Sequence, residues 1–254
     1  MENEKNNFPF VWDNYSDQPH VIKDKAYKKA MRKKHSFDFV KMLLTNAVVF
    51  PLSVLTMKLF SKKEGLEFNK NSFYGLGVNL DKGEGQPELV EELGVKSLMI
   101  RIPLSDIHNL DKYYEFVKSF GEDKQILLNI MQDRNHIDKK DLFSLHITEI
   151  FNTFKDTTAE YQIGTTINRA KWGFFSVKEY LDFYKIAQDI RDDQFPQLKL
   201  LGPSVIDFEY HYTIKALFNF TPIKFDKLSS LLYVDRRGAP QNTQMGIFDT
   251  NNKI

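Results

Sequence analysis

The feature that most constrains the fold is an alternation, from residue 73 onward, of short apolar segments with longer amphipathic ones. Short apolar runs separated by helical patterns are typical of βαβ units, whose strands pair in parallel. We expect strands at residues 73–80, 97–104, 125–133, 160–166, 198–207 and 227–235. The predicted fold class is therefore α/β.

Two of the intervening segments carry clear helix signals. Pro87 opens a short amphipathic stretch that Gly94 closes, which is the usual arrangement of proline at the start and glycine at the end of a helix. A longer helix is predicted over residues 176–193, because apolar side chains between Val177 and Ile190 recur at helical spacing.

The spacing of the strands favours a TIM-type (β/α) barrel. Strand starts lie about 31 residues apart, the size of one unit in a barrel of roughly 250 residues, so eight units would extend to about residue 320. The sequence ends at Ile254. An open doubly wound sheet avoids this deficit, but no Gly-x-Gly-x-x-Gly motif follows the first strand. We predict an incomplete barrel of about six units with an N-terminal helical extension.

Three regions follow from the sequence: a basic polar lead-in (1–40), an apolar segment (41–63) and the barrel (64–254). For the apolar segment three interpretations stay open: a membrane-spanning helix, an interfacial or re-entrant hairpin broken at Pro51, and a soluble helix packed on the barrel. Lysines flank it on both sides, which favours contact with the cytoplasmic leaflet without crossing. We expect a cytoplasmic protein at the inner face of the membrane, with no secretory signal peptide.

Composition excludes several kinds of function. The net charge of +1 gives no overall basic surface for nucleic acid, so no nucleic-acid partner is expected. The absence of cysteine removes disulfides, thiol nucleophiles and cysteine-bound metals. His136 and His211 lack a partner at metal-ligand spacing, and we expect neither a metal nor a cofactor.

Ligand-facing residues of a parallel barrel lie at the carboxyl ends of the strands. In this sequence those positions are polar and carry both signs of charge, as a carbohydrate site would. The candidates include Arg101, Asp133, Thr165, Thr166, Asn168, Arg169, Asp207, Glu209, Tyr233 and Asp235.

Several of these segments resemble a known family. Residues 73–79 and 88–103 look like the opening of a clan A glycoside hydrolase, and residues 161–173 are similar to the segment that carries Asn-Glu after a glycine in that clan. Residues 172–175 and 232–238 also resemble hydrolase-like proteins of bacterial surface-polysaccharide gene clusters. The resemblance covers residues 73–254 and implies a carbohydrate partner.

The resemblance assigns roles that this sequence only partly keeps. Thr165 stands where the clan has the Asn that holds the sugar 2-hydroxyl, and Thr166 stands for the acid/base Glu. A retaining hydrolase needs two carboxyl groups about 5 Å apart, and a threonine hydroxyl cannot replace either. The clan's nucleophile follows a seventh strand, beyond the last residue here. By the same resemblance, Arg101 corresponds to the residue that supports the nucleophile in the clan, and Tyr233 to a residue beside it. Taken together with the strand-end positions, the predicted sugar-binding residues are Arg101, Asn168, Arg169, Trp172, Asp207, Glu209 and Tyr233.

Three functions compete. The first is a glycoside-hydrolase-like protein linked to polysaccharide metabolism and inactive as this chain. The second is a membrane-surface polysaccharide-binding or scaffolding protein. The third is an active enzyme with replacement carboxylates drawn from Asp133, Asp207, Glu209 and Asp235. An incomplete barrel also leaves unpaired strand edges, which residues 42–60, a second copy of the chain or a separately encoded remainder would have to cover.

Overall fold

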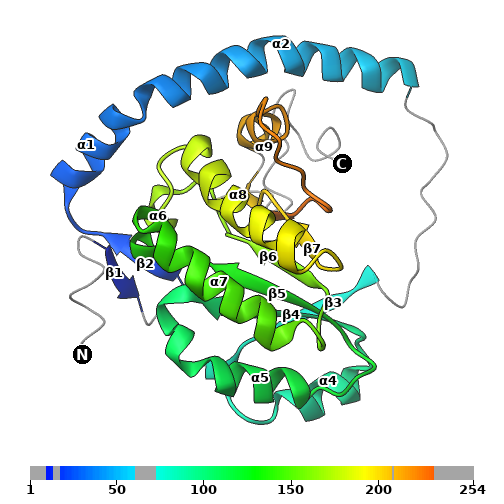
Figure 1. Ribbon diagram of the computed structural model, residues 1–254. Coiled ribbons are helices and arrows are strands. Elements are labelled where there is room, and N and C mark those ends of the chain that lie inside the picture. The colour runs from blue at the N-terminus through cyan, green and yellow to red at the C-terminus, as the bar shows by residue number, and fades with distance from the viewer. Residues whose placement is uncertain (1–9, 14–17, 61–72, 208, 232–254) are drawn as a thin grey trace, which may run out of the picture.

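The computed structural model describes residues 10–13, 18–60, 73–207 and 209–231 (Figure 1). Its centre is a five-stranded parallel sheet in chain order. The strands are β3 (Gly75–Val78), β4 (Ser97–Pro103), β5 (Gln125–Met131), β6 (Glu160–Ile163) and β7 (Lys199–Leu201). The predicted α/β class with a parallel sheet of β/α units is confirmed, and the arrangement resembles part of a TIM barrel.

The fifth predicted strand is divided, and the sixth lies beside both of its parts. Leu201 forms a parallel bridge with Lys227, and β8 (Val205–Ile206) pairs in parallel with β9 (Ser230–Leu231). Pro203 stands in the gap between β7 and β8, and a proline has no N–H to donate to a ladder. Residues 232–235, the rest of the predicted sixth strand, lie outside the described part.

Helices alternate with the strands. They are α4 (Gln86–Leu93), α5 (Leu110–Lys118), α6 (Arg134–Asp138), α7 (Lys140–Phe154), α8 (Val177–Gln194) and α9 (Tyr210–Leu217). The predicted signals are found in the structure: Pro87 lies in the first turn of α4, and Gly94 caps it in the left-handed conformation. The Ser176 side chain accepts a hydrogen bond from the Glu179 N–H at the start of α8.

The two faces of the sheet differ in chemistry. One face packs against the helices through fully buried side chains such as Ile100, Leu128 and Tyr161. On the other face, Gln162 Nε2 donates to Asn129 Oδ1 at 3.0 Å and the Ser229 hydroxyl donates to Gln162 Oε1 at 2.6 Å. The apolar core therefore lies between the sheet and its helices, and the opposite face carries a hydrogen-bonded polar row.

The described residues before the sheet form a small hairpin and two helices. Strands β1 (Phe10–Asp13) and β2 (Gln18–Ile22) form an antiparallel hairpin, and β2 lies against residues 170–172, a 3₁₀ turn after β6. The Phe175 ring is surrounded by Phe10, Tyr27 and His35, with the Arg134 guanidinium 5.6 Å from its centre. The described part of the lead-in, where no strand was predicted, is thus attached to the loops at the carboxyl ends of β5 and β6.

Two helices continue from the hairpin and arch over the domain (Figure 1). Helix α1 (Lys25–Lys34) is basic in its last turn, and α2 (Ser36–Phe60) runs without a break through Pro51. The interpretation as a hairpin broken at Pro51 therefore does not describe this helix. Helix α2 packs on α9 and, less extensively, on α8.

Candidate functional site

The position that resembles the hydrolase acid/base lies directly after β6 and is buried. Thr165 and Thr166 are 4% and 1% exposed. The Gln132 side chain holds the Thr165 backbone from both sides, because its Oε1 accepts from the Thr165 N–H at 2.9 Å and its Nε2 donates to the Thr165 carbonyl at 2.8 Å. The same Nε2 donates to the Trp172 carbonyl at 2.7 Å. The loop after β6 is therefore fixed by a side chain of the preceding strand's end.

The groups around Thr166 are neutral hydroxyls. Thr165 Oγ1 lies 3.5 Å from both Thr166 Oγ1 and Ser204 Oγ. The Ile167 N–H donates to the Ser204 carbonyl at 3.0 Å, which ties this loop to the segment between β7 and β8. Thr166 has a φ of 50°, an uncommon conformation for a β-branched residue. Hydroxyls with such weak acidity do not provide general acid catalysis near neutral pH.

Four of the predicted sugar-binding residues form one cluster beside these threonines. Arg169 pairs with Asp207, and its Nη1 lies 2.7 Å from Glu209 Oε2. Asn168 Nδ2 donates to the same Glu209 oxygen and to the Ile206 carbonyl, both at 2.9 Å, while its Oδ1 accepts from the Ile206 N–H at 3.0 Å. The cluster joins the loop after β6 to β8 and to the residues that precede α9.

The electrostatics of this cluster favour a charged Glu209. Partial burial works to raise the pKa of its carboxyl, but the hydrogen bonds from Arg169 and Asn168 outweigh it and the pKa lies below its usual value. The pKa of Arg169 is raised: burial opposes its charge, and Glu209 and Asp207 outweigh that effect. A carboxylate held in this way accepts hydrogen bonds and is a poor proton donor.

The other candidates are dispersed. Arg101 lies on β4, in register with Asn129, half-buried on the face of the sheet that does not pack on helices. Trp172 ends the 3₁₀ turn after β6 and is half-buried. Asp133 caps α6 and is bound to His136, with both carboxylate oxygens 2.8 Å from Nδ1. Tyr233 and Asp235 lie outside the described residues.

Two groupings were not predicted from the sequence. His136 Nε2 lies 2.8 Å from His146 Nδ1, which extends the Asp133 contact into α7. A second grouping is a lysine-lined pocket between α2, α8 and α9. The pocket has no local sequence signal, because its residues come from four different helices and from the segment after α9. The polar row on the sheet, in contrast, could have been predicted from the alternation of polar and apolar residues along β5 and β6.

Comparison with known proteins gives a distant structural likeness. No family model and no curated protein matches the sequence. A solved structure of a beta-glucosidase from Thermotoga maritima in complex with glucoimidazole is similar over 48% of this chain and 36% of its own, with a TM-score of 0.39 and 14% identity. A likeness at this level describes the course of part of the backbone and carries no argument about activity.

Proposed function

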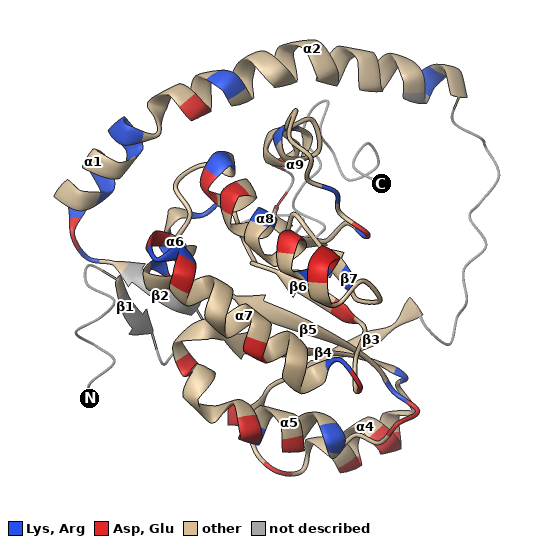
Figure 2. Cartoon of the chain, in the orientation of Figure 1, with Lys and Arg blue, Asp and Glu red and all other residues tan. Residues whose placement is uncertain are grey.

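We propose that this chain is a glycoside-hydrolase-like protein without hydrolytic activity that attaches to a membrane surface and binds or organises a polysaccharide there. The observation that carries the proposal is the exposed apolar surface of α2. Helix Ser36–Phe60 is long and apolar enough to cross a membrane, and only 6% of its most apolar stretch is buried. Figure 2 shows it as an almost uncharged helix on the outside of the domain.

Most apolar side chains of α2 are left uncovered by the described part of the domain. Most of them face solvent, with exposures from 37% for Val54 to 76% for Phe60, and among the side chains of α2 that the structure describes Met42 alone belongs to the buried core. An apolar surface of this extent is more than a monomeric soluble protein usually exposes. The exposed set is Phe37, Phe39, Val40, Leu43, Leu44, Val48, Phe50, Leu52, Val54, Leu55, Leu59 and Phe60.

Attachment along the surface is favoured over a complete crossing. Asn46 Nδ2 donates to the His211 carbonyl at 2.9 Å, and Lys215 Nζ donates to Thr45 Oγ1 at 3.2 Å, so the first half of α2 is bonded to α9. A spanning orientation would break these contacts and place Asp38 and Lys41 near hydrocarbon, which is costly for charged groups. The basic last turn of α1 adds attraction for anionic headgroups.

The proposed lack of hydrolysis is supported by the loop after β6. Thr166 offers a hydroxyl where the family resemblance expects a carboxyl, and the nearby carboxylates of Asp207 and Glu209 are both bound to Arg169. The purified full chain should therefore release no sugar from a broad panel of glycosides. Turnover that disappears in Asp207→Asn or Glu209→Gln would contradict this part of the proposal.

Vesicle flotation of the full chain tests membrane attachment. We expect the protein to float with phosphatidylcholine vesicles, and the double variant Leu44→Gln/Leu55→Gln to bind at least about tenfold more weakly, because each leucine removed from the interface forfeits apolar burial. The matched control is Leu89→Gln/Leu145→Gln. These leucines lie on α4 and α7 and are 56% and 63% exposed, close to the 65% and 54% of Leu44 and Leu55. Equal binding by both variants would overturn the proposal.

A further inference from the structure

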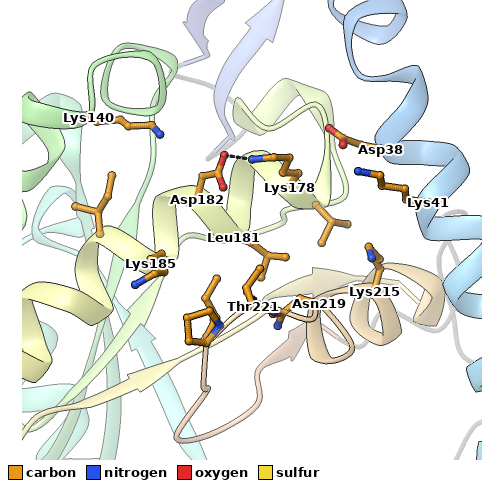
Figure 3. Close-up of a pocket in the computed structure, with 14 residues that line it drawn as sticks. Asp38, Lys41, Lys140, Lys178, Leu181, Asp182, Lys185, Lys215, Asn219 and Thr221 are labelled. Atoms are coloured by element: carbon orange, nitrogen blue, oxygen red, sulfur yellow. Dashed lines mark hydrogen bonds and ion pairs between the residues drawn. The ribbon is translucent and has the colours of Figure 1, made fainter.

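A pocket of about 500 Å³ opens where the first half of α2 meets α8 and α9 (Figure 3). Its volume lies within the range of roughly 300–1,000 Å³ that is usual for ligand sites. The pocket is separate from the strand ends: its walls come from the outer helices and from the segment after α9. Nothing in the function proposed above uses it.

Lysine dominates the polar lining of this pocket. Five lysines face two aspartates, and part of that charge is already paired: Lys178 with Asp182 at 2.5 Å, and Lys185 with Asp189 at 2.5 Å. The second aspartate, Asp38, lies 3.3 Å from His35 Nδ1. In the described part of the chain, no carboxylate pairs with the other three lysines, which are Lys41, Lys140 and Lys215.

Two of these cations are brought together by the packing of α2 on α9. Lys41 and Lys215 extend from the two helices toward the same space (Figure 3). Burial lowers the pKa of Lys215, and the neighbouring charge of Lys41 lowers it further, while the charge of Asp38 opposes them only in part. The buried Met42 and the hydrogen bond that Lys215 Nζ donates to Thr45 Oγ1 hold α2 against α9. An anion between the two ammonium groups would relieve their repulsion.

The rest of the lining is apolar. Val177, Leu181 and Ile186 come from α8, and Pro222 and Ile223 come from the segment after α9. A pocket with cations at its margin and aliphatic side chains on its wall matches a ligand that joins an anionic group to an apolar one. Lysine is a suitable partner for phosphate, which it binds as a point charge.

We propose that this pocket binds the phosphate group of an anionic phospholipid between Lys41 and Lys215, with the lipid's apolar part against Leu181 and Ile223. The inference rests on the proposed attachment of α2 to a membrane and specifies which lipids it selects. The location favours a lipid over a soluble phosphate compound, because Lys41 is on the same helix whose Phe37, Val40 and Leu44 are exposed beside it. A bilayer in contact with that surface would present headgroups at the pocket.

The test compares binding of the full chain to phosphatidylcholine vesicles with and without phosphatidylglycerol. The wild type should prefer the anionic vesicles. Lys41→Gln/Lys215→Gln should lose roughly tenfold or more of that preference while keeping its binding to neutral vesicles, since each basic residue near an anionic surface contributes a several-fold factor. Lys41→Arg/Lys215→Arg, which keeps the charge, should retain most of the preference.

Two matched controls remove the same charge elsewhere. Lys112→Gln/Lys118→Gln changes α5, on the opposite side of the domain (Figure 1), and Lys28→Gln/Lys29→Gln changes the basic helix α1. The α5 variant should behave as the wild type. An equal loss in the α1 and pocket variants would mean a general attraction of basic residues for the surface, and would overturn the assignment of a site.

Further outcomes separate the two proposals. Wild type that binds neither kind of vesicle overturns membrane attachment, and this inference with it. Wild type and Lys41→Gln/Lys215→Gln that show the same preference for anionic vesicles overturn this inference alone. The last experiment is a titration with glycerol 1-phosphate in the absence of vesicles. Saturable binding that depends on both lysines, in a protein that shows no preference for anionic vesicles, would identify a soluble phosphate compound as the ligand and overturn the assignment of a phospholipid.

Discussion

Helices α7 and α2 are both rich in large apolar residues, yet they place them in opposite environments. Every large apolar side chain on the inner face of α7 is fully buried, namely Phe143, Ile147, Ile150, Phe151 and Phe154. Helix α2 has a longer run of such residues, and of its described side chains only Met42 belongs to the core. The comparison shows that apolar content alone does not determine whether a helix belongs to a core.

The difference lies in how the side chains are arranged around each helix. The buried positions of α7 recur at intervals of three and four, so they form one face toward the sheet. The apolar positions of α2, in contrast, surround most of the helix. A helix that is apolar on all sides is typical of a lipid environment or of a core that covers it completely. The described residues cover only the side that meets α8 and α9.

The largest effect should come from truncating a side chain on the buried face of α7. Phe151→Ala should lower the free energy of unfolding by about 3–5 kcal/mol, because the ring is 0% exposed and the cavity cannot close fully. Its centre lies 5.0 Å from the Tyr161 ring and 5.6 Å from the Phe195 ring. Urea denaturation measures the change, and a loss below about 1 kcal/mol would mean that this core is looser than its burial indicates.

Adding atoms should likewise distinguish the buried core, here at Gly202 after β7, from the exposed surface of α2. A Cβ atom at Gly202 would lie 2.1 Å from the Tyr180 hydroxyl oxygen and 3.1 Å from a ring carbon of Phe225. We expect Gly202→Ala to cost about 1–3 kcal/mol in unfolding free energy through overpacking. Ala47→Leu on α2, at an exposed position, adds more atoms and should change stability by less than about 0.5 kcal/mol. Thermal denaturation of both variants checks the contrast.

A smaller effect should appear as a pH dependence at His146, a half-buried residue of α7 next to its buried face. Burial lowers the pKa of His146, and the neighbouring His136 lowers it further. Below a pH of about 6.5 the unfolded chain therefore takes up a proton that the folded chain resists, so the unfolding free energy should fall as the pH drops from there through the lowered pKa. His146→Gln should weaken this dependence in denaturation series at several pH values. The control, His108→Gln, alters an exposed side chain and should not.

The strands and their order could be predicted because each is a short apolar run with an amphipathic helix after it. The burial of the Thr165-Thr166 position could not, because it depends on Gln132 and Ser204, which are distant in sequence. The hairpin before residue 23 was also missed, and the sequence left open whether the apolar segment forms one helix through Pro51 or breaks there. The hairpin depends on contacts with the rest of the domain, such as that of β2 with residues 170–172, which local propensity does not contain.

The candidate site was predicted in part. Asn168, Arg169, Asp207 and Glu209 were expected at the carboxyl ends of neighbouring strands, and the structure joins them directly. That they bind one another was not apparent, since a polar residue at a strand end can face a ligand or a neighbour with the same sequence pattern. The lysine pocket had no signal at all, because its residues belong to separate helices.

The smallest expected effect carries most information about α2. Leu44→Gln/Leu55→Gln should leave the unfolding free energy in water within about 0.5 kcal/mol of the wild type, because both side chains are more than half exposed. The same substitutions weaken vesicle binding if the proposed function is correct. A helix that contributes little to stability while exposing this much apolar surface requires a partner outside the described fold. If instead urea denaturation shows a loss comparable to that of Phe151→Ala, these leucines are buried in solution and α2 belongs to the core as α7 does.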